Sequence, residues 1–384
     1  MRRLLIMLAG VTFAAATLAQ PPEEATEPTL QRWQTLDQPQ SLAPVAPARV
    51  ELMVRATPPP PQRALEIGLV VLDPGTGGDS LSNRQQGVFE DVRSAESRYL
   101  PFALRRALVD SNQWGAVRVL PGSDPGYELL VSGRILVSNG AELSLALTVR
   151  DSLDTVWLEK TYSMVAGENA YLEAERRLRR PFQDLYHEFA NDLYQLKRER
   201  SDAELQRIRE VSELRYAADL LPDAFRSYLG RDESGLISVQ RLPARDDPMI
   251  GRIRRVRAQE YLFIDTTDEQ YAELYTEMTP VYDLWRQYLR EQLAYRESWE
   301  ARLAERDTPR RGSYEAMKQT YNNYKWEKIQ REEMRTLAEG FDNEVAPTAM
   351  ELEGTVVQLS GSLDQRYREW RDLLRQIYQL ETGP

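Results

Sequence analysis

Residues 127–162 read YELLVSGRILVSNGAELSLALTVRDSLDTVWLEKTY, and this stretch decides the fold. Apolar and polar residues alternate in two runs on either side of Asn139-Gly140, and a third apolar run follows Asp154. Such alternation is typical of strands with one buried face. Asn-Gly is a strong hairpin signal, because both central residues of a type I′ turn need positive φ. The stretch therefore predicts a three-stranded antiparallel meander with one apolar face.

The segment before the meander predicts two more strands and a helix. Residues 65–72 are almost wholly apolar, as in a buried strand, and residues 116–120 form a second such run. The helical pattern between them contains Pro101, so the helix either begins near Ser97 with proline in its first turn or kinks. We therefore expect a small α/β domain over residues 63–166, with a helix-backed mixed sheet.

The second half of the chain has helical periodicity and many charges. One apolar stripe begins at Tyr171 and predicts a helix that continues through Leu196. Two short strand insertions are expected within the later helices, at residues 235–242 and 355–359. We therefore expect an elongated, mostly α-helical domain over residues 167–384, and the fold class of the whole chain is α+β.

A further helix is expected to begin within this half. After an apolar break at residues 261–264, Thr267 and Gln270 have the spacing of a capping box that opens a helix. Its stripe from Tyr271 to Trp285 is aromatic. Aromatic residues at helical spacing usually pack in a core, although they could also form a sugar-stacking platform for peptidoglycan.

The amino-terminal residues predict export. Residues 1–19 combine a basic start, a short apolar run and small residues, as in a secretory signal peptide, with an uncleaved anchor as the alternative. Residues 20–62 contain 10 of the 22 prolines, which predicts a disordered tether. The alternating run at residues 50–55 could add to the next domain as an edge strand. We expect a periplasmic protein, peripheral at most to a membrane.

Composition excludes several kinds of chemistry. The chain has no cysteine and one histidine, His187, so thiol nucleophiles, thiolate zinc sites and histidine-rich metal sites are impossible. A lone histidine on a helix is seldom a general base. The formal net charge of −11 argues against nucleic acid as a general partner. No catalytic, cofactor-binding or metal-binding residue is predicted.

The candidate partner-binding residues are Arg252, Arg254, Arg255 and Arg257. They form a concentrated basic run that could meet an anionic lipid, polymer or protein. Apolar residues between them recur at helical spacing, so a solvated helix face is the alternative interpretation.

Carboxylates provide the remaining route to catalysis. Glycoside hydrolysis needs only two of them at a suitable separation, and the chain has 60 Asp and Glu residues. Asp265, Asp268, Asp342 and Glu344 lie near polar breaks, although a helix cap or a solvated loop would explain each. Nothing in the sequence selects a pair.

Residues 65–72, 104–108 and 131–158 together resemble a small α/β module of periplasmic assembly proteins. The module occurs in the amino-terminal domain of TolB, the curli secretion lipoprotein and lipoprotein activators of penicillin-binding proteins. The similarity lies in the order of helices and strands. The two kinds of lipoprotein carry their lipid on a cysteine, which this chain lacks. The resemblance implies a docking module of the envelope without catalysis.

The sequence thus predicts a non-catalytic exported protein that acts as a partner-binding or scaffolding module in the bacterial periplasm. Its partner would be an envelope protein or peptidoglycan. The alternative is a peptidoglycan-directed glycan hydrolase or transglycosylase that uses a carboxylate pair in the helical half.

Overall fold

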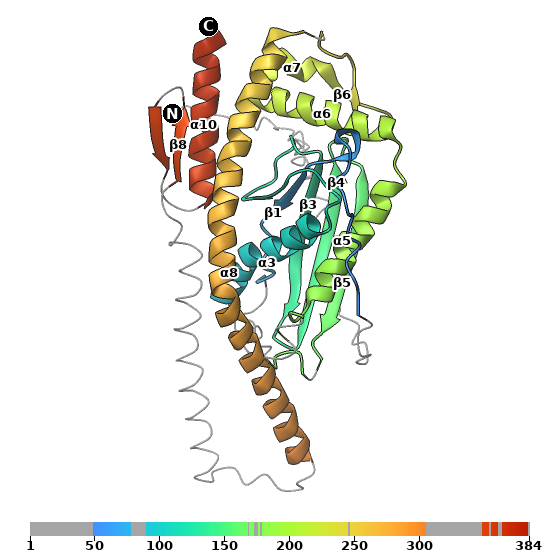
Figure 1. The fold of residues 1–384 in the computed structure, drawn as a ribbon, viewed down its shortest axis with the longest axis vertical. Helices are drawn as coiled ribbons and strands as arrows, with labels where there is room; N and C mark the ends of the chain where they lie inside the picture. The colour runs from blue at the N-terminus through green and yellow to red at the C-terminus, as the bar shows by residue number, and fades with distance from the viewer. Residues whose placement is uncertain are drawn as a thin grey trace, which may run out of the picture. The chain divides into compact units, whose positions relative to one another are not determined.

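The computed structural model describes residues 49–77, 90–167, 169–172, 176, 179–244, 246–304, 348–352, 355–359 and 363–382. A five-stranded sheet in the order β2-β1-β3-β4-β5 organises the fold (Figure 1). β1 is parallel to β2 and β3, whereas β3, β4 and β5 form the predicted antiparallel meander. The α+β class is therefore confirmed. The strands are β1 (Ile67–Val70), β2 (Val117–Leu120), β3 (Leu129–Ser138), β4 (Glu142–Asp151) and β5 (Val156–Val165).

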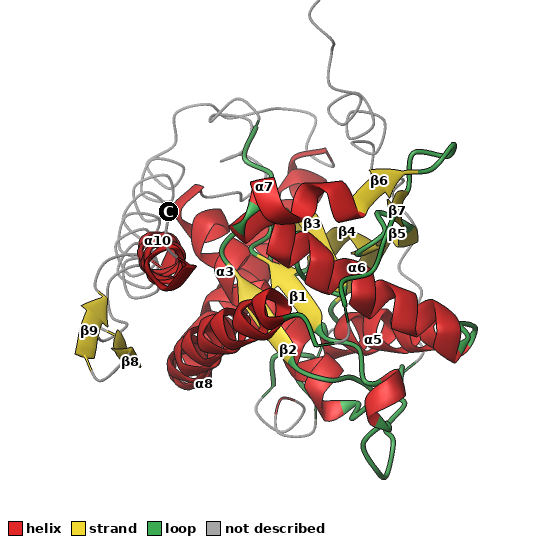
Figure 2. Ribbon diagram, turned by 90° about the horizontal axis from the view of Figure 1, so that it is seen from above, coloured by secondary structure: helices red, strands yellow, loops and turns green. Residues whose placement is uncertain are grey.

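Helices cover one face and one edge of the sheet. α3 and α5 contact each other, α3 packs on β1, β2 and β3, α5 packs on β5, and α8 lies beside the edge strand β2 (Figures 1 and 2). No helix in the described part of the chain has both the length and the apolar character needed to span a membrane. The helices are α3 (Glu90–Asp110), α5 (Gln183–Arg198), α6 (Asp202–Leu220), α7 (Pro222–Phe225), α8 (Pro248–Ala304) and α10 (Leu363–Thr382), with 3-10 turns η1 (Pro61–Arg63) and η2 (Arg226–Tyr228).

Two small hairpins complete the described elements. β6 (Leu229–Arg231) pairs with β7 (Ile237–Val239), and β8 (Thr348–Leu352) pairs with β9 (Thr355–Leu359). β7 and β9 lie where the two short strand insertions were expected.

The turn between β3 and β4 differs from the predicted type I′. Only Gly140 has positive φ, of 80°, and Asn139 does not. The Asn139 side chain instead accepts hydrogen bonds from the backbone N–H groups of Ala141 and Glu142, at 3.2 and 2.8 Å. A Cβ atom at Gly140 would overlap the Arg286 carbonyl, so glycine allows this turn to pack closely against α8.

The helix predicted to run unbroken from Tyr171 is interrupted before Gln183, where α5 begins. Pro181 disfavours helical backbone in the residue before it, and Phe182 has φ of 64°. Tyr171 and Phe182 are nevertheless buried, as the apolar stripe predicts. The chain therefore turns sharply just before α5.

Helix α8 is continuous, so the predicted break at residues 261–264 and the capping box at Thr267 and Gln270 are wrong. Thr267 Oγ1 donates to the Phe263 carbonyl one turn earlier, at 2.9 Å, as threonine does inside a helix. Helix α3 is likewise continuous across Pro101. Packing on the sheet outweighs the local stop signals in both helices.

One hydrophobic core extends across the domain boundary that we expected between residues 166 and 167. Buried side chains of the sheet and α3 form a single cluster with those of α5 and with the aromatic residues of α8. A second cluster joins α6, α8 and α10 to Leu120 and Tyr127 of the sheet region. In the described residues, the helical half thus completes the core of the sheet.

Residues 50–55, which could have added as an edge strand, lie along α5 without strand pairing. Asn191 holds them through two hydrogen bonds of 2.8 Å, one from the Met53 N–H and one to the Glu51 carbonyl. The Arg55 N–H donates to the carbonyl of Ser111, just after α3, at 2.9 Å. We call residues 50–55 the docked segment, since it fixes the end of the proline-rich stretch to the folded domain.

Candidate functional site

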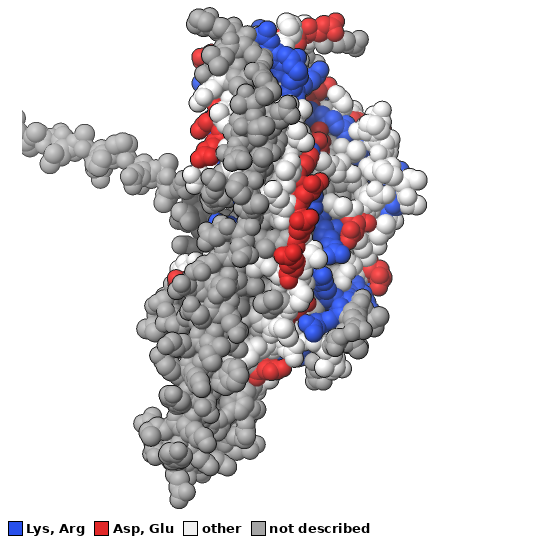
Figure 3. Space-filling model, turned by 60° about the vertical axis from the view of Figure 1, so that its left-hand side comes forward, with Lys and Arg blue, Asp and Glu red and all other residues white. Residues whose placement is uncertain are grey.

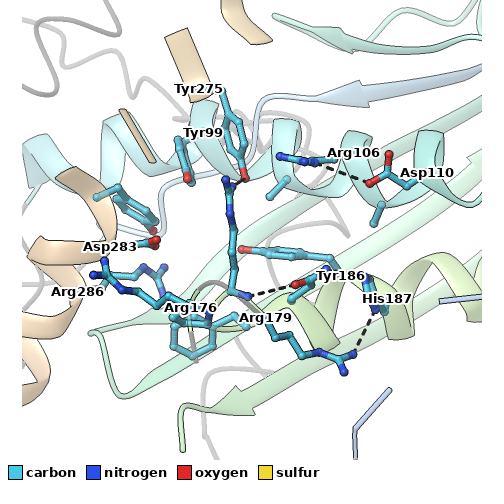
Figure 4. Close-up of a pocket in the computed structure, with 17 residues that line it drawn as sticks. Tyr99, Arg106, Asp110, Arg176, Arg179, Tyr186, His187, Tyr275, Asp283 and Arg286 are labelled. Atoms are coloured by element: carbon cyan, nitrogen blue, oxygen red, sulfur yellow. Dashed lines mark hydrogen bonds and ion pairs between the residues drawn. The ribbon is translucent and has the colours of Figure 1, made fainter. Parts of the chain in front are cut away.

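A pocket of about 250 Å³ lies between α3, the turn before α5, and α8 (Figure 4). Guanidinium and phenol groups dominate its lining. Its basic residues are Arg106, Arg176, Arg179, Arg180 and Arg286, and its tyrosines are Tyr99, Tyr186, Tyr275 and Tyr282. The other lining residues are Ala103, Ala107, Asp110, Pro181, Phe182, Gln183, His187 and Asp283.

The turn at Pro181 and Phe182 brings the arginines to the pocket. Positive φ at an aromatic residue is uncommon and costs on the order of 1 kcal/mol, so packing must hold it in place. The Phe182 side chain is 2% exposed, and the Arg286 guanidinium lies 4.6 Å from its ring centroid. This buried ring fixes the direction of the chain, and Arg179 and Arg180 consequently line the pocket.

Three tyrosines form a wall of the pocket. Tyr99 of α3 lies 4.4 Å, centroid to centroid, from Tyr275 and from Tyr282 of α8. The Tyr282 hydroxyl donates to Glu96 Oε1 at 2.6 Å, and the Tyr99 hydroxyl is 3.1 Å from Thr279 Oγ1. Burial raises the pKa of Tyr99 and of Tyr282 well above the ordinary value. The wall therefore consists of aromatic rings packed against one another, in which Tyr99 and Tyr282 keep neutral hydroxyl groups.

Arg286 is the most buried cation of the pocket, with 2% of its side chain exposed. Its Nη2 donates to Ser138 Oγ at 2.6 Å and to Glu96 Oε1 at 3.2 Å, whereas Nε and Nη1 have no hydrogen-bond partner. Burial lowers its pKa, but Tyr282 and Glu96 raise it to above the ordinary value overall. The side chain is therefore always charged. Arg93, also buried, lies 3.7 Å from Glu96.

Arg180 and Arg176 extend from the turn. Arg180 Nη1 is 3.5 Å from the hydroxyl oxygens of Tyr275 and Thr279, at the limit of hydrogen bonding. Arg176 Nε is buried and has no hydrogen-bond partner. Neither guanidinium is within ion-pair distance of a carboxylate in the part of the chain that the structure describes. Burial raises the pKa of Asp283, and Arg180 and Arg176 oppose that rise.

The docked segment borders the pocket through Arg179 and His187. Arg179 forms an ion pair with Asp184 and donates to the Val50 carbonyl. His187 Nδ1 lies 3.0 Å from the same carbonyl, and Nε2 lies 3.2 Å from Gln183 Nε2. Figure 4 shows the contact of Arg179 Nη2 with His187 Nδ1, at 3.4 Å. The single histidine thus joins the docked segment to the pocket edge.

The four predicted arginines do not form one cluster. Arg257 is half-buried and donates to the Tyr261 hydroxyl at 2.6 Å, and Arg254 pairs with a glutamate of α6. Arg252 and Arg255 form no hydrogen bond or ion pair with any described residue. On the face shown in Figure 3, basic and acidic side chains are interspersed. Arg252 and Arg255 alone therefore stay candidates for binding a partner there.

Of the candidate carboxylates, the two within the described residues, Asp265 and Asp268, do not line the pocket. Asp265 pairs with Arg118 at 2.8 Å, and Asp268 accepts a hydrogen bond from the β2 backbone at 3.1 Å. Burial raises the pKa of Asp268 to about 7. Asp342 and Glu344 lie outside the described residues. Within the described residues, no group of three or more His, Cys, Asp or Glu side chains could hold a metal.

A second basic run marks the pocket in the sequence. It consists of Arg176, Arg177, Arg179 and Arg180, followed by Pro181. The sequence pattern placed these arginines on the charged face of a continuous helix, so it did not predict that some of them line a pocket. A proline directly after four arginines signals a turn that can direct some of them inward.

Comparison of the chain with protein-family models, with curated proteins and with solved structures finds no match. The resemblance to the α/β module of periplasmic assembly proteins therefore remains a prediction from element order. The function must be inferred from the pocket.

Proposed function

We propose that this protein is a non-catalytic binding module of the bacterial cell envelope, which holds an acidic group of its partner in the pocket. One observation carries the proposal: four guanidinium groups in and behind the pocket face only two carboxylates. Arg93 and Arg286 are buried, and Arg176 and Arg180 are partly buried. Removing charge from water without full compensation is costly, so an anion from outside would stabilise the arrangement. The guanidinium groups belong to Arg93, Arg176, Arg180 and Arg286, and the carboxylates to Glu96 and Asp283.

The types of side chain in the pocket favour binding over catalysis. Arginine stays charged and the buried tyrosines stay neutral near pH 7, so neither exchanges protons readily. Both ring nitrogens of His187 have hydrogen-bond partners. An envelope protein or peptidoglycan would fit, because both present carboxylates that arginine can bind through two parallel hydrogen bonds.

One observation favours the alternative, a glycan hydrolase. Asp283 lies in a pocket with aromatic walls, and burial raises its pKa, as in a general acid. A second carboxylate, that of Asp110, also lines the pocket, 3.7 Å from Arg106.

Sedimentation with purified peptidoglycan sacculi tests the proposal. We expect the full chain to pellet with the sacculi without releasing soluble fragments. R180Q should pellet much less, whereas R207Q, which removes an exposed arginine from α6, should behave as wild type. If the partner is a protein, a photo-crosslinker at position 106 in growing cells should capture it in wild type but not in R180Q.

Two results would contradict binding without catalysis in this pocket. Release of soluble fragments that D283N abolishes would show a hydrolase. Equal retention or capture of wild type and R180Q would place the binding surface elsewhere, with Arg252 and Arg255 as the next candidates.

A further inference from the structure

We propose that the pocket is selective for a doubly charged oxyanion, either a phosphate monoester or two neighbouring carboxylates. This selectivity rests on the proposed binding function. The shared chemistry is a compact group with two negative charges and several acceptor oxygens. The excess of two guanidinium groups over carboxylates in and behind the pocket matches that charge.

Free donors in the pocket match such an anion. Nε and Nη1 of Arg286 and Nε of Arg176 are buried without hydrogen-bond partners, and the Arg180 guanidinium has only two marginal hydrogen-bond contacts of 3.5 Å. A buried donor without a hydrogen-bond partner destabilises the protein, so three arginines from two elements gain most from an anion with several oxygens. A single carboxylate carries one negative charge and two acceptor oxygens, so it offers three arginines less charge and fewer acceptors than a dianion does.

The size and walls of the pocket limit what it can hold. At about 250 Å³ it is slightly smaller than the pockets that enclose drug-sized ligands. It therefore suits a charged head group with a few further atoms. The rings of Tyr99 and Tyr275, stacked on each other, form an apolar boundary beside the cations, which limits the room for atoms attached to the head group.

The beginning of α5 adds to the positive potential. Gln183 and His187 of its first turns line the pocket, and Phe182 before it provides no side-chain cap for the free N–H groups. The amino-terminal end of a helix carries partial positive charge. Arg179 and Arg106 are compensated by Asp184 and Asp110, so the inner arginines decide the selectivity.

Calorimetric titration of the full chain at pH 8 and constant ionic strength tests the inference. The probes are inorganic phosphate, which is a dianion at this pH, succinate as a dicarboxylate, and acetate as a monoanion. We expect phosphate or succinate to bind at least about tenfold more tightly than acetate. R180Q and R176Q should each weaken that binding about tenfold, and R207Q should change it less than about twofold.

Each result is informative. Preference for phosphate over succinate identifies a phosphate ester, and the reverse identifies a dicarboxylate. Equal binding of acetate and both dianions, no saturable dianion binding up to about 10 mM, or unchanged binding in folded R180Q and R176Q would overturn the inference. The sedimentation experiment tests the proposed function separately. If pelleting with sacculi still depends on Arg180, the proposed function stands even when the selectivity for a dianion is overturned.

Discussion

Lys197 shows at the scale of one residue how this fold buries charge. Its side chain is 3% exposed, its Nζ donates to the Gln113 carbonyl, and Nζ lies 4.5 Å from the Trp114 ring centroid. Burial, with Arg63, Arg55 and Arg209 nearby, lowers its pKa from 10.5 to about 7. No carboxylate pairs with it in the described residues. Its charged form is therefore a source of instability.

We expect K197M to stabilise the protein below neutral pH. Between about pH 7 and 10.5 the unfolded chain binds the proton more tightly, so stability of the wild type rises with pH over that window. The gain from K197M should be about 5 kcal/mol at pH 6 and should fall below about 1 kcal/mol by pH 10. Urea denaturation across this range measures it. K160M is the control, because Lys160 pairs with Glu188 and Asp192, and it should bring no gain.

Among the elements, the meander, the two buried strands, and the helices α3 and α10 could be predicted, because short-range periodicity determines them. The break in α8 was predicted wrongly. Thr267 has the spacing of a cap, but its hydroxyl is satisfied by the Phe263 carbonyl once the helix packs on the sheet. A cap or break signal spans only a few residues, so it contains no information about a tertiary contact that outweighs it.

The pocket could be predicted only in part, for the same reason. The aromatic stripe of α8 and the arginines before Pro181 are visible in the sequence. Their convergence depends on the positive φ of Phe182. Only glycine, asparagine and aspartate favour such a conformation, so the sequence gives no sign of it at a phenylalanine. Sequence periodicity also cannot predict the pairing of Arg286 with Glu96, because the two residues are 190 positions apart.

The docked segment provides a prediction for one element. Asn191 makes its two hydrogen bonds to backbone groups, so N191A should free residues 50–55 while leaving α5 intact. Hydrogen exchange of the Met53 amide should accelerate at least about tenfold, because each lost hydrogen bond stabilised the segment by about 1 kcal/mol. Q195A is the control, since the Gln195 side chain reaches the docked segment only through Met53 Sδ, at 3.3 Å, in the described contacts. Unchanged exchange in N191A would show that other contacts hold the segment.

For the whole molecule, α8 joins the sheet to the helical region. Asp268 and Asp265 fasten it to β2, and Glu260 connects it to Tyr216 of α6 and Tyr367 of α10, at 2.7 and 2.6 Å. Two buried carboxylates lie near these junctions, Glu260 on α8 and Glu128 directly before β3. Burial raises the pKa of both, that of Glu128 to about 7. Stability of the whole fold therefore depends on pH through groups that lie between its parts.

Asp268 allows this dependence to be tested. Burial raises its pKa from 3.8 to about 7, so the folded state binds the proton more tightly, and its contribution to stability is lost as pH rises through about 7. D268N keeps an acceptor for the β2 N–H but cannot ionise. We expect it to be more stable than wild type by about 4 kcal/mol at pH 8 and to show almost no gain at pH 4, in urea denaturation. D265N, which alters the half-exposed neighbour, should lack this pH-dependent gain. Lower stability of D268N at pH 8 would mean that the charged carboxylate, held by Arg105 at 3.3 Å, fastens α8 to the sheet.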